Sequence, residues 1–237
     1  MPSLSLPLNC DLGEGLSAID AAIMPYIDWA NIACGGHAGN DSTMMKTLTL
    51  AKQHNVTIGA HPSYPDRENF GRISMDISAR ALALSLLEQV KALTLNASKL
   101  NIPIGYIKPH GALYNDCTKP QVLETVISVA KQLDLPLMLL AGQEEISNAC
   151  KQAGVKLIRE AFADRRYDEN GRLVARAQPD ALLDYNESLQ QVRQLQSRQV
   201  ATPSGKLRPL ICDTLCIHSD TSGAIGTAKA IKQQLSL

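Results

Sequence analysis

Four short motifs hold most of the residues in this chain that could do chemistry. They are NIACGGHAGN at 31–40, GAHPSYPD at 59–66, KPHGALYN at 108–115 and CIHSD at 216–220. Each follows an apolar run that is typical of a strand. Because the carboxyl ends of parallel strands meet at one edge of a sheet, we expect the four motifs to converge there. This convergence indicates a catalytic site rather than a scaffold.

The acidic and imidazole side chains in these segments are candidates for proton transfer. Asp11 and Glu14 stand in CDLGEG, directly after the first expected strand. Two carboxylates there could ligate a cation or act as acid and base. His61 and His110 follow later strands, and an imidazole can transfer a proton near neutral pH. Asp164, in EAFADRRYDENG, joins them in the predicted catalytic set.

Lys108 completes the predicted catalytic set. It lies two residues before His110 at a strand end, so both side chains can face the same side. An ammonium group in that place could act as an electrophile or bind a phosphate. Tyr114 and Asn115 add a hydroxyl and an amide to the same motif.

Other polar residues are predicted to bind the substrate. Glycines surround His37, so exposed backbone N–H groups could hold an anion or an oxyanion. Arg72 and Arg165 carry guanidinium groups that suit a clamp on a carboxylate or phosphate. His218 and Asp220 place a carboxylate beside an imidazole, an arrangement that orients the ring. The predicted substrate-binding set is Asn9, Asn31, His37, Arg72, Tyr114, Arg165, His218 and Asp220.

A metal site is a second interpretation of the same motifs. Asp11, His37 and His61 are the candidate ligands. The pair Cys212 and Cys216 lacks a second pair at zinc-site spacing, so we expect no metal there. Each motif also has a structural alternative, which is a capped turn, a buried histidine or a solvated loop. The fifth histidine, His54, lies near an expected helix C-terminus and is predicted to be structural.

Composition excludes several classes of protein. The chain has 237 residues and a formal net charge of zero, so no overall field would attract nucleic acid or an anionic membrane. Its apolar stretches are too short to span a bilayer, and its N-terminus lacks the basic region of a signal peptide. Six scattered cysteines are typical of reduced thiols, and we expect a cytoplasmic protein. The motifs of P-loop NTPases, Rossmann dehydrogenases and the usual serine hydrolases are absent.

Strands alternating with helices predict parallel β–α units. Strands are expected at 4–9, 27–33, 56–60, 102–107, 135–140, 155–159 and 214–217. Helices are expected at about 41–54, 78–100, 120–133, 144–153, 188–198 and 222–237, and segment 200–209 is expected to be a loop or a small hairpin. The fold class is therefore α/β, and residues 1–237 are predicted to form a single domain. That domain is an irregular or seven-stranded (β/α) barrel.

Seven motifs of this chain resemble, in the same order, those of the LamB/YcsF family of 5-oxoprolinase A subunits. They are NCDLGEG, NIACGGHAG, GAHPSYPD, FGR, KPHGALYN, EAFADRRY and CIHSD. The match runs from about Asn9 to Asp220. Some positions depart from the family pattern, namely Gly36, Asn40, Asn69, Ile73 and Ser219. Asn40 stands where an Asp is common, which weakens any metal site that would use that carboxylate.

The resemblance implies a barrel similar to those of glycoside hydrolases and polysaccharide deacetylases. It also implies ATP-dependent hydrolysis of 5-oxo-L-proline, a lactam, to L-glutamate, with ATP and Mg²⁺ as cofactors. The expected partners are 5-oxoprolinase subunits B and C, and a homo-oligomer is compatible with the resemblance. Without a P-loop, the ATP site is left open between this chain and a partner.

The mechanism that we expect begins with phosphorylation of the lactam oxygen by ATP. A water then attacks, activated by Asp11, His61 or His110, while Lys108 and the glycine-loop N–H groups near His37 stabilise negative charge. Arg72 or Arg165 holds the substrate carboxylate. Two alternatives remain: a metal-dependent deacetylase or amidohydrolase of similar fold, and a non-catalytic protein that only binds a ligand.

Overall fold

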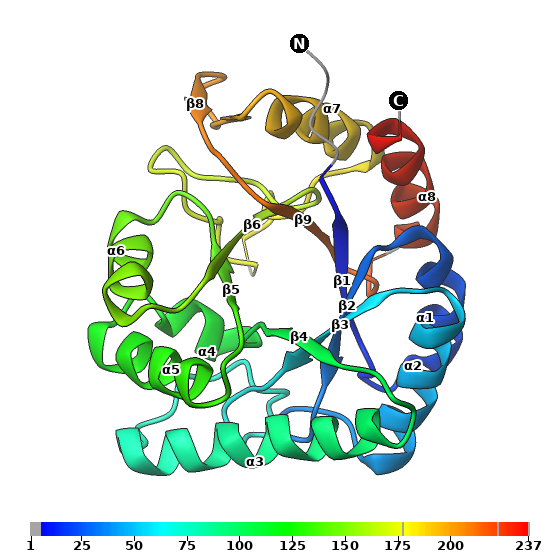
Figure 1. Cartoon of the computed structure of the whole chain (residues 1–237). Coiled ribbons are helices and arrows are strands. Elements are labelled where there is room, and N and C mark those ends of the chain that lie inside the picture. The colour runs from blue at the N-terminus through cyan, green and yellow to red at the C-terminus, as the bar shows by residue number, and fades with distance from the viewer. Residues whose placement is uncertain (1–5, 177, 222, 237) are drawn as a thin grey trace.

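Seven parallel strands close into a barrel in the computed structural model, which describes residues 6–176, 178–221 and 223–236. Figure 1 looks into the ring of strands and shows the helices around its outside. The predicted seven-stranded (β/α) barrel is therefore confirmed. In order around the ring, the strands are β1 (Leu8–Leu12), β2 (Trp29–Ala33), β3 (Thr57–His61), β4 (Ile104–Ile107), β5 (Leu137–Leu140), β6 (Leu157–Phe162) and β9 (Thr214–Ile217).

Helices connect the strands and cover the barrel. They are α1 (Ser17–Ile23), the 3₁₀ helix η1 (Met24–Tyr26), α2 (Asp41–Gln53), α3 (Ala79–Ser98), α4 (Gly111–Asp116), α5 (Pro120–Gln132), α6 (Glu144–Ala153), α7 (Tyr185–Gln196) and α8 (Ala224–Leu235). Segment 200–209 contributes to a two-stranded antiparallel hairpin of β7 (Gln199–Ala201) and β8 (Leu207–Pro209), the second of its two expected forms. Among the described residues, no helix has the length and apolar character needed to cross a membrane.

The sequence missed the shortest helices and misplaced two strands. Helices α1, η1 and α4 have only 7, 3 and 6 residues, too few to show a helical period. Strands β1 and β6 extend past their predicted ends because polar side chains of both point into the barrel. The expected element ends at Leu4, Ser222 and Leu237 lie outside the described residues.

Side-chain caps set the starts of two helices, of which α2 begins at the predicted residue 41 and α7 begins earlier than predicted. From the sequence, Asp41 or Ser42 is expected to cap α2, but Asn40 is the cap, and its side chain accepts a hydrogen bond from the Thr43 backbone N–H. Asp184 caps α7 through the Glu187 N–H, so this helix begins at Tyr185 and not at 188. In both cases a polar oxygen satisfies an N–H group that the helix itself leaves free.

Most buried apolar side chains lie between the strands and the surrounding helices. On β1, Leu8, Cys10 and Leu12 belong to this outer core, whereas Asn9 and Asp11 alternate with them and contact Lys108 on the other side. The alternation follows from the period of two along a strand. One face of β1 therefore builds the core, and the other supplies polar groups to the inside of the barrel.

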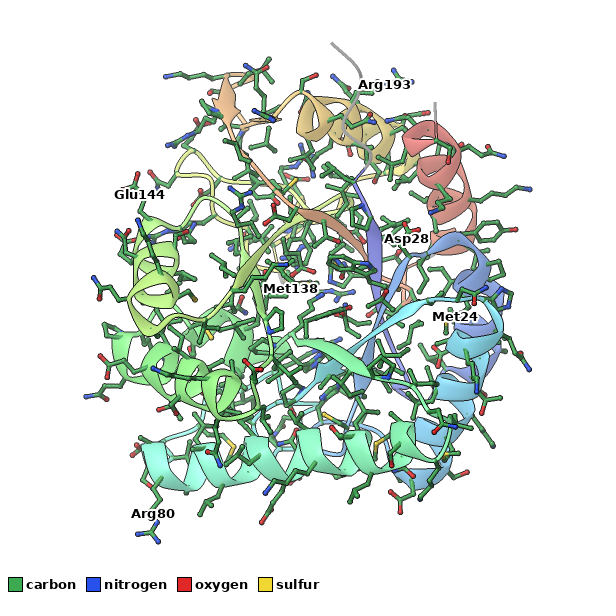
Figure 2. All side chains as sticks on the ribbon, in the orientation of Figure 1. Met24, Asp28, Arg80, Met138, Glu144 and Arg193 are labelled. Carbon is green, nitrogen blue, oxygen red and sulfur yellow. The ribbon has the colours of Figure 1, made fainter. Side chains whose placement is uncertain are left out.

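A second, smaller apolar cluster fills part of the barrel interior. It consists of Tyr106, Met138 and Ile158, with Trp29 packed against them. Figure 2 shows Met138 inside the ring of strands. The hydroxyl of Tyr106 donates a 2.6 Å hydrogen bond to Asn31 Oδ1, so this apolar cluster ends directly at the polar interior.

Gly59 on β3 makes room for the Tyr106 ring. A Cβ atom on Gly59 would lie 2.1 Å from Tyr106 Cε2, which is far closer than a real contact. The pairing of β3 with β4 also shifts register between Ile58 and Gly59. The absence of a side chain at Gly59 thus leaves room for the Tyr106 ring inside the barrel.

We expect Gly59→Ala to destabilise the barrel. The added methyl group overpacks a filled interior, and the free energy of unfolding should fall by about 1–3 kcal/mol. Gly226→Ala is the matched control, because a Cβ at Gly226 of α8 meets nothing within 4 Å. Removing that helical glycine should raise the free energy by about 0.5–1 kcal/mol. Urea unfolding followed by circular dichroism measures both, and equal stability of the two variants would contradict the packing account.

Candidate active site

A cavity of about 820 Å³ is lined by residues that follow the carboxyl ends of the barrel strands. Most of the predicted site residues line it. They are Asp11, Glu14, His61, Arg72, Lys108, His110, Tyr114, Arg165, His218 and Asp220. Asn9, Asn31, His37 and Asp164 are buried behind these residues and contact them instead.

Lys108 lies between two carboxylates inside the barrel. Its Nζ is 2.8 Å from Asp11 Oδ1 and 2.8 Å from Glu160 Oε1. The same atom lies 3.4 Å from Asn9 Oδ1 and 3.3 Å from Cys216 Sγ. Burial alone would lower the pKa of Lys108, but Asp11 and Glu160 are among the groups that raise it well above its ordinary value. Lys108 is therefore a fixed cation and not a base.

Glu160 is the main site residue that the sequence did not identify. Its position was assigned to the loop after a strand ending at Arg159, but β6 continues to Phe162 and turns Glu160 into the barrel. Its exposed fraction is 0%. In principle, an acidic residue inside a strand indicates a buried ion pair, because a charge in a barrel interior needs a partner of opposite sign.

A hydrogen-bonded amide network holds the first carboxylate. Asn31 Nδ2 donates to Asp11 Oδ1 across 2.7 Å and to Asn9 Oδ1 across 2.8 Å. Asn9 in turn donates to Thr214 Oγ1 across 3.0 Å. Burial raises the pKa of Asp11, but the charges of His61 and Lys108 bring it well below its ordinary value. Asp11 is therefore a fixed anion.

Backbone carbonyls determine which nitrogen of two histidines carries a proton. His61 Nδ1 lies 2.8 Å from the Lys108 carbonyl oxygen, and His110 Nε2 lies 3.1 Å from that of Phe70. A carbonyl oxygen only accepts hydrogen bonds, so both of these nitrogens donate. In the neutral rings, the lone pairs are then on His61 Nε2 and His110 Nδ1, which are 3.0 Å apart.

Glu14 faces this pair of nitrogens together with a third imidazole. Its Oε1 is 3.0 Å from His37 Nε2, 3.5 Å from His110 Nδ1 and 4.0 Å from His61 Nε2. Burial and the charge of Asp11 raise the pKa of Glu14. Burial, together with the neighbouring His61 imidazole, lowers the pKa of both His37 and His110 to about 2. Those two rings are neutral at physiological pH.

His218 is oriented by a different carboxylate from the one expected. Its Nδ1 lies 3.0 Å from Asp164 Oδ2, and the same oxygen accepts its backbone N–H across 2.8 Å. Burial would raise the pKa of Asp164, but His218 lowers it, so the carboxylate is charged. Asp220, the neighbour in sequence, instead accepts two hydrogen bonds from Arg176, at 2.7 and 2.8 Å. The predicted pairing of His218 with Asp220 is therefore wrong.

Arginines line the outer part of the cavity. Arg72 is half-exposed, lies 3.7 Å from Asp220 and stacks over the Phe70 ring at 5.0 Å. Arg165 is buried: its Nη2 donates to the Val174 carbonyl across 2.7 Å, and its Nε has no hydrogen-bond partner among the described residues. Arg165 is thus a buried cation with a free donor beside the cavity.

The glycine loop around His37 does not line the cavity. A Cβ at Gly36 would lie 2.3 Å from Gln89 Oε1, and Arg67 donates to the carbonyl oxygens of Gly35 and Gly39, each across 2.9 Å. These contacts hold the glycine loop against α3 and against the loop that follows β3. This packing does not support the predicted oxyanion site formed by the N–H groups of the loop.

The remaining histidine, His54, lies exposed at the C-cap of α2, near the helix end where it was expected.

Within the described part of the chain, two sets of side chains hold donor atoms close enough for a metal ion. In each set the donor atoms lie within 4.8 Å of one another. The sets are Glu14, His37, His61 and His110, and Asp11, Cys216 and His218. Of the predicted ligands, His37 and His61 share the first set, whereas Asp11 belongs to the second and is already bonded to Lys108 and Asn31.

Known proteins resemble this chain along nearly its whole length. Two of them are 5-oxoprolinase A subunits. The one from Vibrio cholerae is 40% identical over 99% of both chains, and the one from Vibrio parahaemolyticus is 43% identical over 97% of this chain and 95% of its own. The crystal structure of a lactam utilization protein from Thermus thermophilus superposes with a TM-score of 0.90. It is 32% identical, over 98% of this chain and 96% of its own.

The family model for LamB/YcsF matches residues 6–237, which span every strand of the barrel and every residue around the cavity. The relatives and the solved structure agree with that match in length as well as in sequence. The chain belongs to the LamB/YcsF family.

Proposed function

We propose that this chain is one component of an ATP-dependent 5-oxoprolinase, which opens 5-oxo-L-proline to L-glutamate while ATP is converted to ADP and phosphate. Relatives that are 5-oxoprolinase A subunits by name support the reaction class. The observation that carries the proposal is the buried Lys108 cation beside a cavity that also exposes a carboxylate-oriented imidazole. An amide carbonyl needs both groups, one for its oxygen and one for the attacking water.

Lys108 is the electrostatic group in this proposal. Negative charge develops on the lactam oxygen as the carbonyl is activated and attacked, and a preorganised cation stabilises that charge. Because Asp11 and Glu160 hold the ammonium group in place, little reorganisation is needed during the reaction. The phosphorylated oxygen of the activated lactam would carry charge at the same place.

His218 is the water-activating base in this proposal. Its Nδ1 is turned to Asp164, which leaves Nε2 as the nitrogen that can face the cavity. The same use of a buried carboxylate orients the histidine of hydrolytic triads. Asp11 is less suitable, since its pKa is held low by His61 and Lys108 against the effect of burial. His61 and His110 turn their free nitrogens toward each other.

The reaction balances with two waters. The γ-phosphoryl group of ATP moves to the lactam oxygen and ADP leaves. A water gives its proton to His218 and bonds to the carbon, the ring C–N bond breaks as the nitrogen gains a proton, and a second water releases phosphate. Arg165, which lines the cavity, binds the substrate carboxylate, and Arg72 binds phosphate at the cavity mouth.

The cavity is large enough for more than the lactam. Its volume of about 820 Å³ lies in the range of about 300–1,000 Å³ that holds drug-sized ligands. A five-membered lactam fills a small part of that space, so a phosphoryl donor can lie beside it. Subunits B and C are the proposed partners, and the word "subunit" in the names of the relatives supports an assembly.

Removing the Lys108 charge should abolish most activity. We expect Lys108→Gln to lower kcat for ATP-dependent glutamate release, assayed with subunits B and C, by about 10²-fold or more. Lys91→Gln, on the exposed face of α3, is the control and should keep wild-type kcat. If Lys108→Gln does not fold, Lys108→Gln combined with Glu160→Gln removes one charge of each sign. Wild-type turnover in a folded variant would sink the assignment.

Asp164 acts through His218 as a positioning residue. Asp164→Asn should lower kcat by roughly 10²–10⁴-fold with little change in KM. The reason is that the His218 imidazole loses its orientation, while the groups that bind the substrate are unchanged. Asp164→Glu should restore part of the rate, and exposed Asp180→Asn should have no effect. A rise in KM with unchanged kcat would instead place Asp164 in substrate binding.

ATP binding by the isolated chain tests where the nucleotide lies. Titration calorimetry with ATP and Mg²⁺ should detect one site. Arg72→Ala should weaken it about 10-fold or more, as expected for a lost charge-assisted hydrogen bond. Arg80→Ala, on the outside of α3 (Figure 2), is the control. No heat from a folded chain would put the ATP site on a partner.

A metal-dependent amidohydrolase is the second candidate function. The set Glu14, His37, His61 and His110 favours it, since a metal-bound water can attack an amide without ATP. Opening of 5-oxoproline in the absence of nucleotide, and its loss on chelation, would support this candidate over the first. A strict requirement for ATP would exclude it.

A further inference from the structure

The free nitrogens of His61 and His110 face each other in an arrangement that needs a positive charge between them, from a proton or from a metal ion. Each ring donates its other N–H to a backbone carbonyl, so two lone pairs face each other across 3.0 Å in the neutral state. Two lone pairs at that distance repel each other. Either a proton shared between the rings or a metal ion must lie there.

Two more donors point at the same place. Glu14 Oε1 lies 3.5 Å from His110 Nδ1 and 4.0 Å from His61 Nε2, and His37 Nε2 lies 3.0 Å from Glu14 Oε1. All four donor atoms lie within 4.8 Å of one another. A proton bridges two atoms, whereas this set has three nitrogens and one carboxylate oxygen, which favours an ion of higher coordination number.

The spacing of the donors fits a small transition metal. Ligand atoms at about 2.0–2.1 Å from a tetrahedral zinc ion are about 3.4 Å apart from one another. The measured separations of 3.0, 3.0, 3.5 and 4.0 Å lie on both sides of that value. Imidazole nitrogens with one carboxylate are a donor set that suits zinc and similar divalent ions.

The surroundings of His61 and His110 match those of metal ligands, whereas His37 Nδ1 has no hydrogen-bond partner among the described residues. Metal-binding histidines commonly donate their second N–H to a carbonyl or carboxylate, as His61 does to the Lys108 carbonyl and His110 to the Phe70 carbonyl. The three rings are at least nine-tenths buried, and His37 stacks on His110 at 3.6 Å between ring centres. The donors are thus held in place before an ion binds.

We propose that Glu14, His37, His61 and His110 bind one divalent transition metal ion of the zinc type. Three of these residues, Glu14, His61 and His110, line the cavity, so the ion is reachable from it. Asp11 is not counted among the ligands, because its Oδ1 is bonded to Lys108 and Asn31 and its Oδ2 lies 3.4 Å from His61 Nε2 but outside the set of mutually close donors. The inference concerns ion binding only and does not depend on the proposed 5-oxoproline reaction.

Direct measurement of bound metal tests the proposal. The full chain is purified without a histidine tag, stripped with a chelator, and reloaded with Zn²⁺ or Co²⁺. We expect about one equivalent of zinc by mass spectrometry, and cobalt should give the visible absorption bands of a tetrahedral site. Glu14→Gln keeps the shape of the side chain, and His110→Phe keeps the ring stack. Each should weaken zinc binding by about 100-fold or more.

Two control variants separate this site from others. His54→Phe removes an exposed imidazole at the end of α2 and should leave zinc uptake unchanged. Cys216→Ser removes a donor of the second candidate set and should also leave it unchanged. Thermal unfolding checks that each variant folds, and Glu14→Gln carries the test if His110→Phe does not fold.

Two results would overturn the proposal. A folded wild-type chain that takes up neither Zn²⁺ nor Co²⁺ would mean that His61 and His110 share a proton instead. Wild-type uptake in Glu14→Gln and His110→Phe, with loss in Cys216→Ser, would place the ion with Asp11 and His218. Because the readout is bound metal, failure here leaves the glutamate-release assay unaffected.

Discussion

The buried ion pairing of Lys108 with Asp11 and Glu160 is the interaction on which the site depends. Taking these charges out of water is costly, and removing one partner of a buried pair typically costs about 3–5 kcal/mol. The barrel offsets that cost by holding the ammonium between two carboxylates at 2.8 Å, with amides of Asn9 and Asn31 completing the contacts. A fixed cation in a place with little water is the result, and that is the group an activated carbonyl requires.

The remaining architecture keeps this pairing in place. Below it, Tyr106 and Met138 close the barrel interior, and the missing side chain at Gly59 lets the tyrosine ring fit there. Above it, the cavity exposes the groups that follow the strand ends, among them His61 and His218. The charged layer thus lies between apolar packing on one side and the cavity on the other.

Much of the fold could be predicted from the pattern of apolar and polar residues in the sequence. The repeated order of apolar strand, polar motif and helix predicted a seven-stranded barrel, and the polar motifs after the strands do line one cavity. The short helices were missed because they hold too few residues for a period. Glu160 was missed because a charged residue inside a strand looks like the start of a loop until its partner Lys108 is known. Likewise, His218 was paired with its neighbour Asp220, although its true partner is Asp164, 54 positions away.

The sequence by itself determined the strand–helix order, the family and the polar residues at the strand ends, because these depend on side-chain type and local spacing. Only the tertiary structure decided which groups meet. Partners such as Lys108 and Glu160, or His61 and His110, lie on or just after different strands, and their contact depends on how the barrel closes. The protonated nitrogens of the two histidines also depend on carbonyl oxygens brought in by folding. Electrostatics act through distance in space, which spacing along a chain does not encode.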